Sequence, residues 1–101
     1  MTEFSQGDII KIRGFDNPFL IVSNNAFIRA TNFFHVCPVL QADKGALHIE
    51  LTGKNGTKGV AVCEQIKLID PAARNCRRID RLSYNENMNI SDAIQGIFEY
   101  D

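Results

Sequence analysis

The stretch FFHVCPVLQ, residues 33–41, has the composition of a buried β-strand but carries a proline close to its end. Aromatic and β-branched side chains favour strands, whereas proline has no backbone N–H to donate to a neighbouring strand. We therefore predict that strand pairing stops near Pro38 and that the chain turns away there. The residues after the proline would then lie in a loop, where binding and catalytic side chains often occur.

Other short runs have the periodicity or composition of strands, at residues 9–13, 19–23, 46–51, 60–69 and 76–82. In the run 46–51, His48 and Glu50 alternate with apolar residues, so both are expected to be exposed. The Val- and Ile-rich run 60–69 lacks helix caps and predicts one long strand. Between these two runs lies Asn55-Gly56, the dipeptide preferred in hairpin turns.

The C-terminal part of the sequence predicts a helix over residues 84–100. Ser83 and Glu86 have capping-box spacing, in which each side chain accepts a hydrogen bond from a free backbone N–H. An apolar stripe follows at helical spacing, formed by Ile90, Ile94, Ile97 and Phe98. Asparagines in the first turns are poor helix formers, so a start at Ser91 is an alternative. Shorter helical turns are expected within 24–32 and 70–74.

These elements predict a mainly β, α+β fold. Five or six strands precede one long helix, without the β–α–β alternation of parallel sheets. The simplest arrangement is a small, strongly curved antiparallel sheet or open barrel that packs on the C-terminal helix. The length of 101 residues fits a single domain, residues 1–101.

Composition and charge argue against several classes of protein. No apolar run approaches the roughly 20 residues of a membrane helix, and the N-terminus lacks a secretory signal. Three cysteines without C-x-x-C spacing predict reduced thiols, buried at Cys37 and Cys63, in a cytoplasmic protein. Residues 1–82 carry 11 basic and 8 acidic residues (+3), whereas residues 83–101 carry 4 acidic and no basic residues (−4). A mildly basic body thus precedes an acidic C-terminal element.

The sequence lacks the usual motifs of most enzyme sites. It has no phosphate loop, dinucleotide fingerprint or nucleophile elbow. His35 and His48 have no partners at metal-ligand spacing, so neither a metal nor another cofactor is expected. Glu64-Gln65 interrupts an apolar run. The Glu64 carboxylate is either a surface group at a sheet edge or a group placed for acid–base chemistry or ligand contact.

The order of five motifs resembles the MazF/PemK family of toxins from type II toxin–antitoxin systems. The motifs are GDIIKI (7–12), NPFLIVSNN (17–25), VCPVLQ (36–41), GVAVCEQIKLID (59–70) and RIDRLS (78–83). Each is loose alone, but five in register over residues 6–100 are fairly specific. The resemblance implies a small SH3-like antiparallel β-barrel with a short helix and a C-terminal helix.

The same resemblance implies a homodimer that cleaves single-stranded RNA without a metal or other cofactor and thereby halts growth. An antitoxin-like peptide would wrap the dimer and block its RNA groove, and the two together would bind operator DNA. In the cleavage, the ribose 2′-OH attacks the adjacent phosphate. This reaction needs a proton acceptor, a proton donor, and a cation or hydrogen-bond donor at the phosphoryl oxygens.

The resemblance also implies a set of site residues. Glu64 stands where the family has Asp and is the candidate catalytic group, while the neighbouring Gln65 matches the family. The candidate nucleic-acid-binding residues are Arg13, Asn17, Gln41 and Gln65.

Two family positions have changed in this chain. Asn17 precedes Pro18 where the family has Arg, and Leu40 lies two residues after Pro38 where the family has Thr. Loss of one preorganised donor of this kind costs on the order of 10²–10³ in rate. Three hypotheses therefore stay open. The protein is a ribonuclease with a rearranged site, a non-catalytic member that binds an antitoxin-like peptide, RNA or operator DNA, or a barrel-shaped interaction module.

Overall fold

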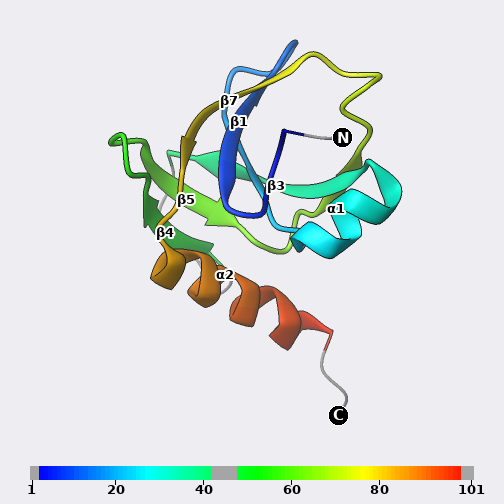
Figure 1. The fold of residues 1–101 in the computed structure, drawn as a ribbon. Helices are drawn as coiled ribbons and strands as arrows, with labels where there is room; N and C mark the ends of the chain where they lie inside the picture. Colours follow the sequence, from blue (N-terminus) through cyan, green and yellow to red (C-terminus); the bar gives the residue numbers. More distant parts are fainter. Residues whose placement is uncertain (1–2, 42–47, 99–101) are drawn as a thin grey trace.

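The computed structural model describes residues 3–41 and 48–98 (Figure 1). Within them the chain forms a seven-stranded sheet and two helices. The elements, in chain order, are β1 (Asp8–Ile12), β2 (Phe19–Ile21), α1 (Asn25–Thr31), β3 (Phe34–Leu40), β4 (His48–Thr52), β5 (Lys58–Val62), β6 (Lys67–Ile69), β7 (Cys76–Arg81) and α2 (Tyr84–Ile97).

The strands pair in the order β4-β5-β3-β2-β1-β7, with β6 added beside β3, and every pair is antiparallel. β3 is the central strand. It pairs with β2 along one edge, and with β6 and then β5 along the other. The prediction of a mainly β, α+β fold with a curved antiparallel sheet is confirmed, and the alternating runs of the sequence are the reason it could be made.

The hairpin between β4 and β5 closes the curved sheet by reaching the far edge strand, β7. The backbone N–H of Lys54 donates to the carbonyl of Arg81 at 2.9 Å. The buried Asp80 carboxylate accepts from Asn55 N at 2.8 Å and from Thr57 N at 3.0 Å. Two strands that are far apart in the sheet order are thus joined, and the sheet becomes a barrel.

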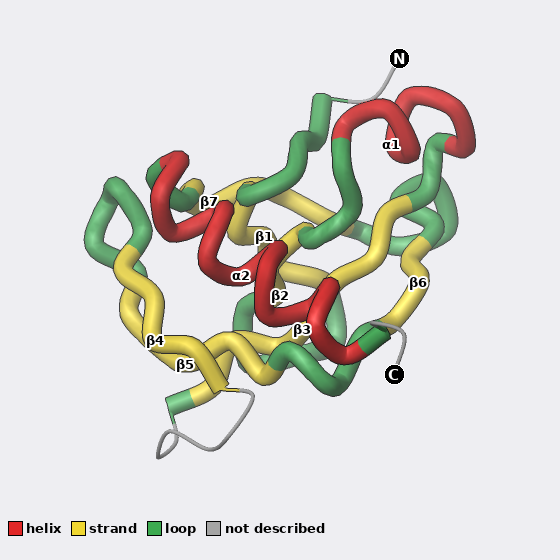
Figure 2. Tube along the Cα trace, turned by 90° about the horizontal axis from the view of Figure 1, so that it is seen from below, coloured by secondary structure: helices red, strands yellow, loops and turns green. Residues whose placement is uncertain are grey.

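Side chains alternate between two apolar layers, one on each face of the sheet. One layer contains Leu20 and Ile9 and is covered by α2 through Ile90. The other contains Phe19 and Phe34 and is covered by α1 through Ile28. In Figures 1 and 2, α2 lies beneath the curved sheet as drawn in Figure 1, and α1 lies at its side.

The prediction that strand pairing stops at the proline is wrong. β3 continues through Pro38 to Leu40, and Pro38 pairs with Phe19 of β2. The N–H of Val39 donates to a carbonyl on the β2 side. Because N–H direction alternates along a strand, the nitrogen of Pro38 faces the other edge, where β3 changes partner from β6 to β5. The proline therefore sits at a position that needs no hydrogen-bond donor.

The prediction of one long strand over residues 60–69 is also wrong. The run divides into β5, which ends at Val62, and β6, which begins at Lys67. A turn separates them, closed by a hydrogen bond from Gln65 N to the Val62 carbonyl at 3.1 Å. Glu64 and Gln65 therefore lie in a turn and not in a strand.

The C-terminal helix begins where the capping motif indicates, and the alternative start at Ser91 is wrong. Ser83 is the N-cap, and its hydroxyl accepts from Glu86 N. The Glu86 carboxylate accepts from Thr52 N at 2.7 Å, which ties α2 to β4. α2 ends at Ile97, and the predicted end at Tyr100 lies outside the described residues.

The apolar stripe of α2 is only partly buried. Ile90 is in the core and Ile94 packs against it, whereas Ile97 and Phe98 are exposed. In the part of the chain that the structure describes, no helix is long and apolar enough to cross a membrane.

The remaining local predictions have mixed outcomes. A helical segment within 24–32 is confirmed as α1, while residues 71–74 form a hydrogen-bonded turn on Asp70. The predicted strand 46–51 is seen from His48 onward, its first two residues lying outside the described ones. Cys37 and Cys63 are buried free thiols, as expected.

Candidate functional site

The turn between β5 and β6 places the Glu64 carboxylate beside a histidine. The Oε1 atom of Glu64 lies 3.2 Å from Nε2 of His48, the first residue of β4. The side chains are 40% and 25% exposed, respectively, so a ligand can reach both while each keeps the other oriented. A carboxylate and an imidazole in contact form a pair that can accept and donate protons.

His48 is a residue that the sequence reasoning missed, because alternation alone indicated a simply exposed strand position. It is instead half-buried and opposite Val62 in the β4–β5 ladder. The signal that could have found it was the Asn55-Gly56 hairpin. Folding the chain about that turn brings His48 opposite the end of β5, next to the turn that holds Glu64.

The two positions that depart from the family pattern lie side by side. The β2–β3 register pairs Phe19 with Pro38, and its continuation places Asn17 beside Leu40. The Asn17 Nδ2 group donates to the Pro18 carbonyl at 2.9 Å, so the amide is engaged by its own backbone. This part of the site therefore presents an amide and a hydrocarbon and no cation.

Cross-strand pairing puts these positions on the same face of the sheet as His48. Leu40 is opposite Val60, and His48 is opposite Val62, two residues further along β5. Residues two apart on a strand share a face. Glu64 lies in the turn after β5, and its link to this face is the contact with His48.

One cation that was not a candidate belongs to the same face. Lys67 pairs with Val36 of β3, whose side chain lies on the face that also carries Leu40. The ammonium group of Lys67 is 5.7 Å from the centre of the Phe15 ring, which belongs to the loop between β1 and β2. The lysine is thus held over an aromatic ring and places a positive charge on this face of the sheet.

The structure brings only some of the predicted site residues together. Gln65 is exposed in the same turn as Glu64, and Gln41 follows β3 with its amide donating to the Lys58 carbonyl. Arg13 is separate from them. It lies just after β1, where its N–H donates to the Asn75 carbonyl, and it lines a cavity of about 360 Å³ at that end of the sheet.

Two core thiols lie close enough to Glu64 to be affected by its charge. A hydrogen bond with Cys63 and burial raise the pKa of the Cys37 thiol, while the same hydrogen bond lowers the pKa of Cys63. Both side chains lie in the core cluster with Leu20. Their contribution is to packing beneath the site.

Within residues 3–41 and 48–98, no three His, Cys, Asp or Glu side chains are close enough together to hold a metal ion. The chemistry that the described side chains offer is proton transfer by Glu64 and His48 and charge stabilisation by Lys67. These are the groups required for cleavage of a phosphodiester by a neighbouring hydroxyl.

Comparison with known proteins gives one family and a set of similar folds. A model of the family described as PemK-like, MazF-like toxin of type II toxin–antitoxin system matches residues 3–98. A search of curated proteins gave no significant match.

Solved structures with the same fold cover nearly the whole chain. A MazE–MazF complex from Deinococcus radiodurans superposes with a TM-score of 0.83 at 17% identity, over 100% of both chains. An endoribonuclease in complex with its cognate antitoxin, from a mycobacterial species, gives 0.80 at 16% identity, over 97% of this chain and 99% of that one. The Mycobacterium tuberculosis toxin MazF-mt6 gives 0.70 at 21% identity, over 95% and 99%. At these identities the likeness shows the fold.

Proposed function

The chain belongs to the PemK-like, MazF-like toxins of type II toxin–antitoxin systems, and we propose that it inhibits growth by cutting single-stranded RNA in the cytoplasm. It acts as a homodimer, and an antitoxin-like peptide restrains it by covering the RNA-binding face. Support for the activity and the partner comes from similar folds: one is an endoribonuclease bound to its antitoxin, and another is a MazE–MazF complex.

The observation that carries the proposal is the contact between Glu64 and His48. Glu64 takes the proton of the ribose 2′-OH as the 2′-oxygen bonds to phosphorus. The bond from phosphorus to the 5′-oxygen breaks, and His48 in its protonated form gives its proton to that leaving oxygen. The products are a 2′,3′-cyclic phosphate and a 5′-hydroxyl. Because the two side chains touch, the proton on Glu64 can return to His48 and restore the pair.

Lys67 supplies the positive charge that is missing because Asn17 stands where the family has Arg. Its ammonium group faces the same side of the sheet and has no carboxylate within ion-pair distance among the described residues. Charge that develops on the phosphoryl oxygens is stabilised by such a group in a partly enclosed site. Gln65, exposed beside Glu64, is placed to contact a base or the sugar.

A second candidate function follows from the Asn17–Leu40 pair. The Asn17 amide is engaged by its own backbone and Leu40 is apolar. This end of the site can therefore contact a ligand but cannot transfer a proton to it. A non-catalytic member would keep the face for an antitoxin-like peptide, for RNA, or for operator DNA together with an antitoxin.

The decisive test replaces Glu64 by Gln and, separately, His48 by Gln in the purified dimer. Glu64→Gln keeps the shape of the side chain, and His48→Gln keeps a polar side chain that can hydrogen-bond; each change removes the proton transfer, so we expect cleavage of a mixed-sequence RNA to fall by about 10²–10⁴-fold. The measurement is the rate at which 2′,3′-cyclic phosphate ends appear. Asp92→Asn removes the same charge from the exposed side of α2 and should cleave like the unmodified protein. A protein that leaves RNA intact at high enzyme concentration, yet binds it, would favour the second function.

A further inference from the structure

Basic side chains gather along the edge of the sheet formed by β7 and its neighbour β1. We call this set the basic edge; its members are Lys11, Lys54, Arg77, Arg78 and Arg81. They make up five of the 11 Lys and Arg residues in a chain whose net charge is −1. Positive charge is therefore concentrated at a place that the mechanism above does not use.

Two of these cations face each other without an acidic partner. Lys11 is directly opposite Arg77 in the β1–β7 ladder. Like charges at directly opposed positions destabilise a sheet. No ion pair joins either side chain to a carboxylate in the described part of the chain, and the Lys11 ammonium instead donates to the Asp16 carbonyl. A bound anion would remove this repulsion.

The two arginines at the other end of the edge are oriented by one buried carboxylate. Asp8 is 2% exposed, and its oxygens lie 3.6 Å from the Arg78 guanidinium and 3.8 Å from that of Arg81. The arginine side chains are 43% and 51% exposed, so a ligand can reach both from solvent. A single carboxylate positions two guanidinium groups and leaves a net positive charge.

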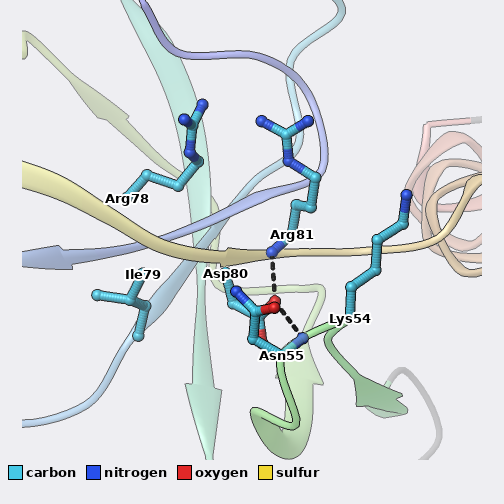
Figure 3. A pocket seen from close by; sticks show the side chains of 6 residues that line it. All are labelled: Lys54, Asn55, Arg78, Ile79, Asp80 and Arg81. Atoms are coloured by element: carbon cyan, nitrogen blue, oxygen red, sulfur yellow. Dashed lines mark hydrogen bonds between the residues drawn. The ribbon is translucent and has the colours of Figure 1, made fainter.

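These arginines share a cavity with the hairpin that closes the barrel. Figure 3 shows Arg78 and Arg81 extending to the same side of β7, with Lys54 of the hairpin beside them. The cavity has a volume of about 350 Å³ and is also lined by Asn55. Asp80 also lines the cavity, and its carboxylate oxygens already accept backbone N–H groups, so the three cations of this cavity outnumber the two carboxylates beside them, Asp8 and Asp80.

We propose that the basic edge binds the phosphodiester backbone of single-stranded RNA outside the cleavage site. Forked guanidinium donors match phosphate oxygens. From Arg77 to Arg81 the edge extends about 13 Å along the strand, which suits a chain of phosphates better than one isolated anion. This inference rests on the proposed function, because it takes RNA as the ligand.

An acidic polypeptide is the main competing ligand for such a surface, and one contact disfavours it. A peptide that bound here as an added strand would need the free backbone groups of β7. The Arg81 carbonyl already accepts from Lys54 N, so the hairpin occupies this end of the edge. Charged side chains can also serve only to protect an exposed edge strand from pairing with other chains. The test therefore measures RNA binding, which that protective role alone would not change.

The experiment measures the salt dependence of RNA binding in a background that cannot cleave, Glu64→Gln. A labelled single-stranded RNA of about 20 nucleotides, longer than the roughly 4–16 nucleotides of one single-strand site, is titrated by fluorescence anisotropy at several salt concentrations. Arg77→Gln and Lys54→Gln are the test variants, because neither residue forms an ion pair with another described residue. Each lost phosphate contact should reduce the slope of log K against log salt by about 0.7, and the double variant by about 1.4.

Arg29→Gln on α1 is the matched control and should keep the slope of the Glu64→Gln background. Slopes that stay unchanged in the test variants, or that change equally in the control, overturn the proposal. Loss of binding to poly-glutamate with an unchanged slope for RNA also overturns it and identifies the edge as a site for acidic protein. If the unmodified protein cleaves no RNA but the slopes fall as expected, the proposed function fails and the basic edge stands.

Discussion

The surroundings of two acidic residues, Asp80 and Glu64, differ in almost every respect. Asp80 is 3% exposed and accepts three hydrogen bonds from backbone N–H groups of the hairpin and of β7 itself. The Glu64 side chain is 40% exposed and contacts the His48 side chain from a turn. Both residues lie within runs that the sequence predicts as strands, Glu64 in 60–69 and Asp80 in 76–82.

The difference separates a carboxylate that closes the barrel from one that is available to a ligand. Every oxygen of Asp80 already has a donor, so the group has no capacity for chemistry and much influence on stability. Glu64 has one oxygen in contact with His48 and a side chain that is 40% exposed, so it can accept a proton from a substrate while contributing little to folding. The two regions should therefore respond in opposite ways to substitution.

The strongest test of this contrast is at the joint between the β4–β5 hairpin and β7, where the Asp80 carboxylate accepts from Asn55 N and Thr57 N. Asp80→Ala removes the acceptor for Asn55 N, Thr57 N and Arg81 N, and we expect the free energy of unfolding to fall by about 3 kcal/mol. A Cβ atom at Gly53 would overlap the Asp80 carboxylate, so Gly53→Ala should cause a loss of similar size. Urea denaturation of the two single variants and the double variant measures both effects.

The double variant shows whether Gly53 acts through Asp80. If it does, the two losses are not additive, and the double variant is about as stable as Asp80→Ala alone. Gly96→Ala is the matched control, because nothing lies within 4 Å of the added methyl group on α2. It should stabilise the protein by up to about 1 kcal/mol. If the two losses add fully, the overlap between a Cβ at Gly53 and the Asp80 carboxylate is not the cause of the loss in Gly53→Ala.

The joint should also set part of the acid sensitivity of the fold. Burial alone would raise the pKa of Asp80, but hydrogen bonds from Thr57, Asn55 and Arg81 outweigh burial and lower the pKa to about 2 from an ordinary value of 3.8. A carboxyl whose pKa is lower in the folded state stabilises the fold above its unfolded pKa. That stabilisation, about 2 kcal/mol, is lost as the pH falls from near 4 through 2.

Comparison with Asp80→Asn isolates this contribution, because asparagine does not titrate. Unfolding free energies of both proteins, measured from pH 5 down to pH 2, should converge as the pH falls. Parallel curves would show that the hydrogen bonds to Asp80 do not favour its charged form.

Local patterns predicted the fold better than they predicted the site. Alternation and turn dipeptides indicate strands and hairpins directly, so the antiparallel sheet and the start of α2 could be found. The path through Pro38 and the break after Val62 could not, because they depend on β3 changing partners, which no local pattern records. The contact between Glu64 and His48 lay between these cases. To predict this contact, the strands had to be combined with the register of the β4–β5 hairpin, which places His48 opposite Val62.

Sequence proximity was a poor guide to the candidate site. Arg13 and Asn17 belong to the same short connection, yet Arg13 lines a cavity at the β1–β7 end of the sheet and Asn17 lies beside Leu40. Lys67, which follows the predicted catalytic residue by only a few positions, was not singled out because it was placed in an unbroken strand. The division of that strand is what gives Glu64 its turn.

The smallest expected effect on stability is at the candidate pair, and it completes the contrast. Glu64→Gln and His48→Gln each break one half-exposed ion pair, whose contribution is about 0–1 kcal/mol. We therefore expect each variant to keep its unfolding free energy to within about 0.5 kcal/mol, although RNA cleavage is lost. The losses of the two single variants should not add fully in the double variant, because both substitutions break the same ion pair. A loss as large as that at Asp80 would show that the pair supports the barrel, and the assignment of this turn to catalysis would lose its physical basis.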